Sequence, residues 1–135
     1  MERVCLQSTS STCGAASGAT ILKALGVEVT ESQLAAEAHS YMGGTEAWYL
    51  ARALRKRGVT VRFRHGEGLD AEVNFPAIAG VRLGKVGHFI AILGKEGELF
   101  QIGDPLRGEE SLAAEDLLKR YGFTGFYMEV GRLEQ

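Results

Sequence analysis

Cysteine and proline are scarce in this sequence. Its 135 residues include two prolines and two cysteines, and both cysteines, Cys5 and Cys13, lie near one end of the chain. Two thiols so placed make a poor disulfide framework, and they are too few for a zinc site without histidine ligands. We therefore expect reduced thiols in a reducing compartment, and we predict neither a metal nor a cofactor.

Long apolar runs and an excess of one charge are also absent. There is no apolar run of 18 residues and no charged-then-apolar leader at Met1, so we expect neither a membrane span nor a signal peptide. A formal charge of -2 argues against nucleic acid as a partner. The few clustered basic residues fit a solvated face better than a site for an acidic partner: Arg52, Arg55, Lys56, Arg57, Arg62 and Arg64.

The remaining composition is that of a globular protein. Apolar residues make up 45% and charged residues 24% of the chain, which excludes a disordered tail. A chain of 135 residues can bury one core but not two ordinary ones. We expect residues 1–135 to form a single domain.

Helical patterns fill the first half of the chain. Small and apolar side chains follow Cys13, and Thr30 and Gln33 have the spacing of a capping box. Gly26 and Gly58 provide natural ends for the helices that precede them. The predicted helices span residues 13–25, 30–42 and 45–57.

After Gly58 the sequence changes to short runs rich in Val, Phe and Ile, which are typical of strands. One short helix, 112–121, is predicted behind a Ser111 cap. The predicted strands span residues 59–65, 76–83, 88–93, 99–102 and 123–130, with an irregular connection at 66–74. Helices first and mostly antiparallel strands second predict an α+β fold, with N-terminal helices packed on a C-terminal sheet.

Two residues are candidates for a nucleophile and its base. Cys13 opens a helix, where unpaired N–H groups and the helix dipole favour a thiolate; a small buried cysteine is the alternative. His88 begins a strand after a loop at 84–87, where scaffolds present reactive groups; a structural histidine is the alternative. His39 and His65 fit exposed positions on a helix and at a strand end.

Asp104 is the candidate for the group that orients the base. A hairpin with a three-residue loop at 95–97 and a left-handed Gly97 places residue 92 opposite 100, and His88 opposite Asp104. Directly opposite residues have Cβ atoms about 4.5–5.5 Å apart, so the carboxylate would hold the imidazole and stabilise its protonated form. The alternative is a turn residue before Pro105.

Gln7 is the fourth candidate. It lies six residues before Cys13, and its amide group would join the Cys13 backbone N–H in holding a developing oxyanion. A polar surface glutamine is the alternative. Taken together, four individually ambiguous residues fall in the order that one mechanism needs, which favours a cysteine-dependent enzyme.

With these residues the chain resembles the bacteriocin-processing, double-glycine peptidases. That family of papain-like cysteine peptidases often forms the N-terminal domain of peptide-exporting ABC transporters. The resemblance covers nearly the whole chain, and its motifs are Gln7, Cys13-Gly14, the Gly44-Thr45 pair before a helix, the strand FPAIAGV, and the GHF and GDP segments that contain His88 and Asp104.

The resemblance implies a papain-like fold and cleavage after a Gly-Gly pair at the end of a leader peptide. It implies that Cys13 is the nucleophile, His88 the base and Asp104 its orienter. Gln7 would be the oxyanion donor. The implied partners are a peptide substrate and a transporter or larger parent protein, and the implied location is the cytoplasm or the cytoplasmic face of a membrane.

The sequence departs from that family in two ways. Thr12 stands where many members have aspartate, which leaves substrate details open. No GxxxxGK[ST] phosphate loop occurs, so the chain is either an excised domain or a stand-alone peptidase. Two other functions stay open: a non-catalytic leader-binding domain of the same fold, and another papain-like activity such as acyl transfer or deamidation.

Overall fold

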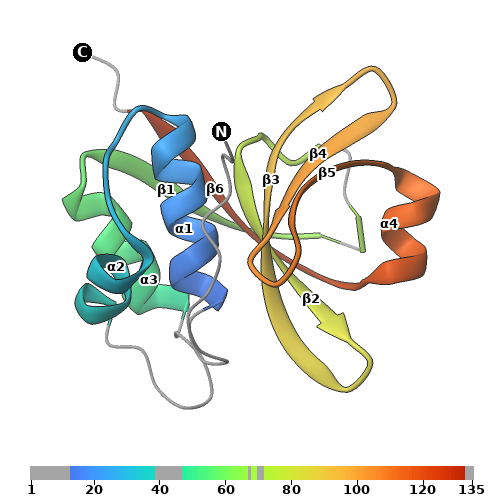
Figure 1. The fold of residues 1–135 in the computed structure, drawn as a ribbon, viewed down its shortest axis with the longest axis horizontal. Helices are drawn as coiled ribbons and strands as arrows, with labels where there is room; N and C mark the ends of the chain where they lie inside the picture. Colours follow the sequence, from blue (N-terminus) through green and yellow to red (C-terminus); the bar gives the residue numbers. More distant parts are fainter. Residues whose placement is uncertain (1–12, 39–46, 67, 70–71, 133–135) are drawn as a thin grey trace.

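A computed structural model describes residues 13–38, 47–66, 68–69 and 72–132, and the structural statements below concern these residues. They form helices and strands that follow one another as drawn in Figure 1. The helices are α1 (Cys13–Ala24), α2 (Glu31–Glu37), α3 (Ala47–Lys56) and α4 (Ala114–Arg120). The strands are β1 (Val59–His65), β2 (Ala77–Leu83), β3 (Val86–Glu96), β4 (Leu99–Asp104), β5 (Gly108–Ala113) and β6 (Gly122–Arg132).

The strands form one six-stranded sheet in the order β1-β6-β2-β3-β4-β5, and every neighbouring pair is antiparallel. The final strand, β6, therefore lies between β1 and β2. Helices α1, α2 and α3 lie on one side of the sheet and α4 on the other (Figure 1). This confirms the predicted α+β arrangement of N-terminal helices packed on an antiparallel sheet.

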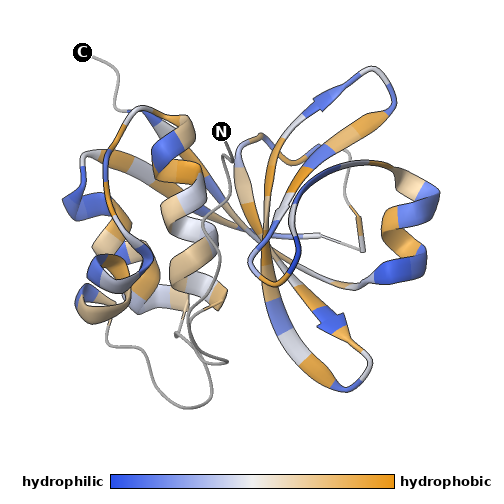
Figure 2. Ribbon diagram, viewed as in Figure 1, coloured by the Kyte–Doolittle hydropathy of each residue, from blue (hydrophilic) through white to orange (hydrophobic). Residues whose placement is uncertain are grey.

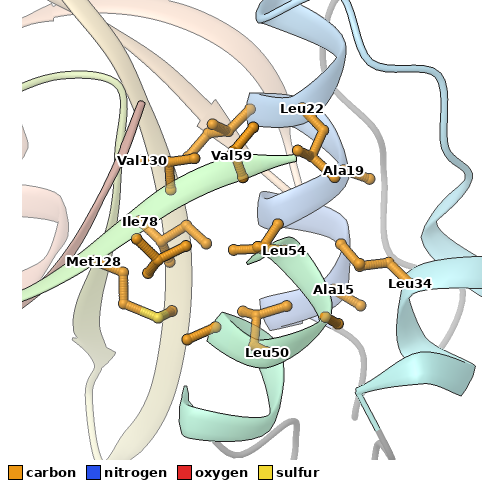
Figure 3. Packing of buried hydrophobic residues seen from close by; sticks show 14 of the residues in the cluster. Ala15, Ala19, Leu22, Leu34, Leu50, Leu54, Val59, Ile78, Met128 and Val130 are labelled. Atoms are coloured by element: carbon orange, nitrogen blue, oxygen red, sulfur yellow. The ribbon is translucent and has the colours of Figure 1, made fainter. Parts of the chain in front are cut away.

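The sheet buries apolar side chains on both faces. Along β2, Ile78 belongs to the core shared with α1, α2 and α3, whereas Ala77 and Ala79 belong to a second core that includes Leu117 of α4. Figure 3 shows the first core, in which side chains from these helices meet Val59, Ile78, Met128 and Val130 of the sheet. Hydrophilic and apolar residues alternate along α2 and α4 in Figure 2, as expected for helices with one buried face.

Helix α1 is buried along most of its length. Every residue from 13 to 22 is buried, which explains why the helix is built largely from small side chains. At Gly18 an added Cβ atom would lie 2.8 Å from Leu34 Cδ2, so glycine allows α2 to approach this closely. Because α1 also packs on β3, its N-terminal residue, Cys13, lies beside the sheet.

Several predicted helix boundaries are confirmed. Thr30 and Gln33 form the capping box: Gln33 N donates to Thr30 Oγ1 (3.0 Å), and Thr30 N donates to Gln33 Oε1 (2.9 Å). The two predicted stop glycines have a left-handed φ of 86°: Gly26 and Gly58. Helix α2 ends at Glu37, earlier than predicted, and residues 39–42 of that prediction lie outside the described residues.

The predicted helix at 112–121 is wrong at its start. Its first residues belong to β5, which pairs with β4, and α4 begins only at Ala114. Ser111, the predicted cap, instead lies opposite Gln101 in the ladder. The backbone hydrogen bonds that β5 makes with β4 outweigh the local capping preference, which is worth only about 1 kcal/mol.

Candidate active site

Cys13 and His88 line the same pocket, which has a volume of about 400 Å³. Cys13 is the first residue of α1, and His88 lies near the start of β3. Cys13 is 7% exposed and His88 6% exposed, so both are almost covered by protein while bordering a space that a ligand can enter. The other lining residues are Gly80, Val81, Val86, Gly87, Phe89, Thr124 and Phe126.

The His88 imidazole is held between two partners. Its Nε2 lies 2.9 Å from Asp104 Oδ1 in a buried contact. The Cys13 side chain borders the same pocket and interacts with the imidazole closely enough to raise its pKa. Because Nε2 is occupied by the carboxylate, Nδ1 is the ring nitrogen that remains for the Cys13 sulfur. The structure therefore brings together three of the four predicted site residues.

The strand register that joins His88 to Asp104 differs from the predicted one. Strands β3 and β4 pair Ile92 with Ile102, and a β-bulge shifts the register between Ile92 and Gly94. The predicted pairs, 92 with 100 and 88 with 104, are wrong. The turn has two residues between the pair Glu96–Leu99 instead of the three predicted, and the β-bulge adds one unpaired residue to β3. If the observed register is continued beyond Ala91 and Gly103, residue 90 lies opposite Asp104, and His88 is a diagonal neighbour of Asp104 on the same face. The Cα atoms of diagonal neighbours are about 7–8 Å apart, a distance that long side chains can bridge.

Asp104 accepts hydrogen bonds on both carboxylate oxygens. Besides the imidazole, Oδ1 accepts from the Leu106 backbone N–H at 2.9 Å, and Oδ2 accepts from the Tyr121 hydroxyl. Burial alone would raise the pKa of Asp104. The hydrogen bonds from His88, Tyr121 and Leu106 outweigh burial and hold this pKa below its usual value. The carboxyl group, 2% exposed, is thus a buried carboxylate with each oxygen satisfied.

The same network controls the charge of His88. Burial alone would lower the pKa of the imidazole, because it disfavours the charged form. Hydrogen bonds and charge interactions with Asp104 and Cys13 outweigh this effect and raise the pKa of His88 to about 9. At neutral pH the ring is therefore mainly an imidazolium, the partner that a cysteine thiolate requires.

The remaining residues singled out in the sequence either lie outside the described residues or lie away from this pocket. Gln7 and Cys5 lie outside the described residues, as do Thr12 and His39. His65 is exposed, and its ring contacts Phe126 edge-on with centroids 5.5 Å apart. The sequence did not indicate Tyr121 as part of the site. Its side chain is 1% exposed, and its hydroxyl donates a hydrogen bond to Asp104.

Neither a metal centre nor a membrane-crossing helix was found in the described part of the chain. No group of three or more His, Cys, Asp or Glu side chains there could hold a metal ion. None of the described helices has the length and apolar character needed to cross a membrane.

Comparisons with known proteins identify relatives over nearly the whole chain. The model of the Peptidase C39 family matches residues 2–132. A double glycine motif protease from an AMS/PCAT transporter, crystallised with the leader peptide, is 26% identical with a TM-score of 0.82, over 96% of this chain and 91% of that chain. The peptidase domain of Streptococcus ComA, a bi-functional ABC transporter, has the same TM-score of 0.82 at 21% identity, over 98% of this chain and 100% of that chain.

Two archaeal sequences are also similar. Uncharacterized proteins from Methanothermobacter marburgensis and Methanothermobacter thermautotrophicus are each 32% identical, over 98% and 97% of this chain and 91% and 89% of their own lengths. The fold is that of the papain-like cysteine peptidases, in which helices pack on an antiparallel sheet. The match of the family model shows that the chain belongs to the Peptidase C39 family.

Proposed function

We propose that this protein is a cysteine peptidase with Cys13 as nucleophile, His88 as base and Asp104 as the group that orients His88. The observation that carries the proposal is the imidazole held between the Cys13 side chain and the Asp104 carboxylate at one pocket. A nucleophile, a base and an orienting group within hydrogen-bond reach are what acyl-transfer chemistry needs. Membership of the Peptidase C39 family supports the same assignment.

The proposed reaction proceeds through a thioester. The Cys13 thiolate attacks the carbonyl carbon, a C–S bond forms, and the carbonyl electrons move onto oxygen. The His88 imidazolium gives its proton to the leaving amine as the C–N bond breaks. Neutral His88 then takes a proton from water, whose oxygen attacks the thioester, releasing the peptide acid and restoring thiolate and imidazolium. Asp104 stays ionised throughout and stabilises the imidazolium.

We propose from the sequence that Gln7 helps to stabilise the oxyanion in this mechanism. The Cys13 backbone N–H, at the start of α1, is one candidate donor to the oxyanion, and the Gln7 amide would be the second. Donors of this kind are worth about a hundred- to a thousandfold in turnover when they are removed one at a time. We therefore expect Gln7→Ala to lower kcat by about that factor.

We propose that the scissile bond follows a Gly-Gly pair in a leader peptide. Glycines lack Cβ atoms, so they can pass through a narrow groove beside Cys13. The relative described as a double glycine motif protease, in complex with its leader peptide, supports this choice. Since that relative comes from a transporter, we also propose that the client is an exported peptide, met at the cytoplasmic face of a membrane.

Because glycine offers almost no side-chain area to bury, upstream residues of the leader must supply most of the binding free energy. A candidate surface lies on α3 and comprises Trp48, Arg52, Arg55 and Lys56, which line a hollow of about 530 Å³. We call it the α3 surface. Trp48 is 55% exposed there, so it offers apolar area to a partner.

A row of aromatic rings links the α3 surface to the pocket. The Arg55 guanidinium lies over the Phe63 ring, 6.0 Å from its centroid, and the Phe63 and Phe126 centroids are 5.8 Å apart. Phe126 in turn lines the pocket with Cys13. We propose that apolar leader residues dock along this row. We propose that the loop at 43–47 contributes as well; residues 43–46 of it lie outside the described residues.

Three peptides test the proposal. The first is a leader-like peptide ending in Gly-Gly, the second replaces Gly-Gly by Ala-Ala, and the third keeps Gly-Gly without the upstream apolar residues. Efficient cleavage of the first peptide alone is the expected result. Similar rates on all three would reject the double-glycine specificity. Mass spectrometry distinguishes the reactions, because hydrolysis adds water across a cut chain, whereas transfer or deamidation leaves the chain whole.

A matched pair of variants tests the α3 surface. Trp48→Ala should raise KM for the leader-like peptide with little change in kcat, because it removes contacts made before and during the reaction alike. Leu118→Ala is the control, since Leu118 is similarly exposed at 54% but lies on α4, which occupies the other side of the sheet (Figure 1). An unchanged KM in Trp48→Ala would remove the α3 surface from substrate binding.

A further inference from the structure

The Asp104 carboxylate is fixed from two directions. Its Oδ1 atom faces His88 and the Leu106 N–H, each at 2.9 Å, while its Oδ2 atom accepts the Tyr121 hydroxyl. A carboxylate bonded only through one oxygen can turn about its Cβ–Cγ bond. Donors on both oxygens define the plane of the group and hence the direction in which Oδ1 meets the imidazole.

Tyr121 is itself rigidly placed. It is 1% exposed, it follows the last turn of α4, and its backbone N–H donates to Leu117 O at 2.9 Å. Its ring belongs to the second core and meets the Phe123 ring edge-on, with centroids 6.3 Å apart. The phenol therefore reaches Asp104 from a packed position.

A surface ion pair supports the tyrosine from outside. The Arg120 guanidinium lies over the Tyr121 ring, 6.0 Å from its centroid. Arg120 Nη1 is 2.8 Å from Glu110 Oε2 on β5, and Arg107 Nε is 3.4 Å from Glu110 Oε1. The phenol proton points to Asp104, because the Tyr121 hydroxyl donates to Oδ2 and an ionised carboxylate only accepts.

We propose that Tyr121, supported by Arg120, is a positioning residue that fixes the Asp104 carboxylate toward His88. This inference rests on the proposed function, because the groups that it positions are the proposed base and nucleophile. Tyr121 does not touch the pocket, so it acts through Asp104 alone. The titratable groups in contact with Asp104 are His88 and Tyr121, with Cys13 beyond the first and Arg120 beyond the second.

Loss of the Tyr121 hydroxyl should change the pKa of Asp104 and therefore the pH dependence of the site. The hydroxyl lowers the pKa of Asp104, so its removal raises that pKa. Asp104 then takes up a proton at a higher pH than in the wild type, and the imidazolium loses its counter-charge at that higher pH. A tyrosine that served packing alone would leave this pH dependence unchanged.

The test compares Tyr121→Phe with Tyr127→Phe. Tyr127 is a matched control, because it is also 1% exposed in the second core, while its hydroxyl donates to the Gly68 carbonyl. In Tyr121→Phe we expect kcat on the leader-like peptide to fall roughly tenfold, the scale of one lost hydrogen bond, with KM unchanged. The acid limb of the pH profile should move to higher pH in Tyr121→Phe and stay in place in Tyr127→Phe.

A second readout needs no peptidase activity. The rate at which iodoacetamide alkylates Cys13, followed against pH by peptide mapping, reports the thiolate and imidazolium pair directly. The acid limb of this profile should also move upward in Tyr121→Phe. If the wild-type enzyme cuts no peptide but this shift is seen, the proposed function fails while the positioning role stands.

A substitution at the surface tests the proposal even if the buried variant does not fold. Arg120→Gln changes a side chain that is 26% exposed, and it should move the alkylation profile in the same direction by a smaller amount. A wild-type alkylation profile in a folded Tyr121→Phe overturns the proposal. If Tyr121→Phe does not fold, a wild-type profile in Arg120→Gln overturns it equally.

Discussion

The hydroxyl of Ser17 donates a hydrogen bond to the backbone carbonyl of Phe89, with the two oxygen atoms 3.1 Å apart. Ser17 is 0% exposed and lies one turn after Cys13 on α1, whereas Phe89 follows His88 on β3. The bond therefore ties the helix that carries the thiol to the strand that carries the imidazole, close to both groups.

The first prediction is that Ser17→Ala lowers turnover more than its loss of stability explains. Removing the hydroxyl should cost about 1 kcal/mol in the free energy of unfolding and loosen the distance between Cys13 and His88. Thr20→Val is the control, because the Thr20 hydroxyl donates to Ala16 O within α1 at 3.0 Å. Equal kcat in both variants, at equal stability, would contradict a positioning role for Ser17.

The pH profile supplies the second prediction. The pKa of His88 is raised to about 9, so the imidazolium that protonates the leaving amine is present below that pH and is lost above it. Activity should therefore stay near its plateau from neutral pH to about pH 8 and fall as pH rises through 9. A basic limb near 6.5, the ordinary value for histidine, would show that the ion pair does not form.

Asp104→Asn should keep the fold and lower turnover. The amide removes the charge that raises the pKa of His88, so the basic limb should also move to lower pH. We expect a smaller loss than in Cys13→Ala, because the thiolate and the imidazolium still stabilise one another. Circular dichroism checks the fold and steady-state kinetics the rate; wild-type turnover in Asp104→Asn would remove Asp104 from the mechanism.

The two thiols should differ in reactivity. Cys13 lies at the start of a helix and borders the same pocket as His88, whereas Cys5 is predicted from the sequence to be an ordinary thiol. Iodoacetamide near pH 6, followed by peptide mapping, should label Cys13 first. His88→Ala should abolish this preference, and faster labelling of Cys5 in the wild type would count against the assigned nucleophile.

Replacing Gly125 by alanine should destabilise the protein more than replacing Gly58, another glycine with a left-handed φ. The φ of Gly125 is 88°, and an added Cβ atom would overlap the carbonyl oxygen of Gly66. Gly58 has a φ of 86° with nothing within 4 Å, so Gly58→Ala measures the cost of the dihedral angle alone, about 1–2 kcal/mol. Urea unfolding should show a larger loss for Gly125→Ala, and equal losses would mean that the Gly66 segment moves aside.

Local patterns were sufficient to predict where the elements begin and end over much of the chain. The capping box at Thr30 and the glycine stops depend on residues that are close in sequence, and the strand at 59–65 is β1 as predicted. The meeting of His88 with Asp104 followed from two strand ends joined by a short hairpin. The sequence could not predict that His88 and Asp104 are diagonal neighbours and not opposite ones. The β-bulge before Gly94 that sets their register has no distinctive residue pattern.

Contacts between distant segments account for what the sequence did not reveal. The predicted helix at 112–121 included Tyr121, and nothing in that pattern marks its hydroxyl as a partner of Asp104, 17 residues away. The contact exists because β5 extends the sheet before α4 turns back over it, and β5 forms only by pairing with β4. A strand with charged residues such as Glu109 and Glu110 carries little local signal of its own.

The central place of β6 determines when a newly made chain can complete the fold. During synthesis Cys13 leaves the ribosome before the strands of the sheet, whereas β6, which joins β1 to β2, follows every other strand. Until it emerges, β1 lacks its partner in the sheet and the first core lacks Met128 and Val130. At roughly 5–20 residues per second, an unfinished chain spends several seconds in this state. The proposed activity would therefore begin only after β6 has left the ribosome.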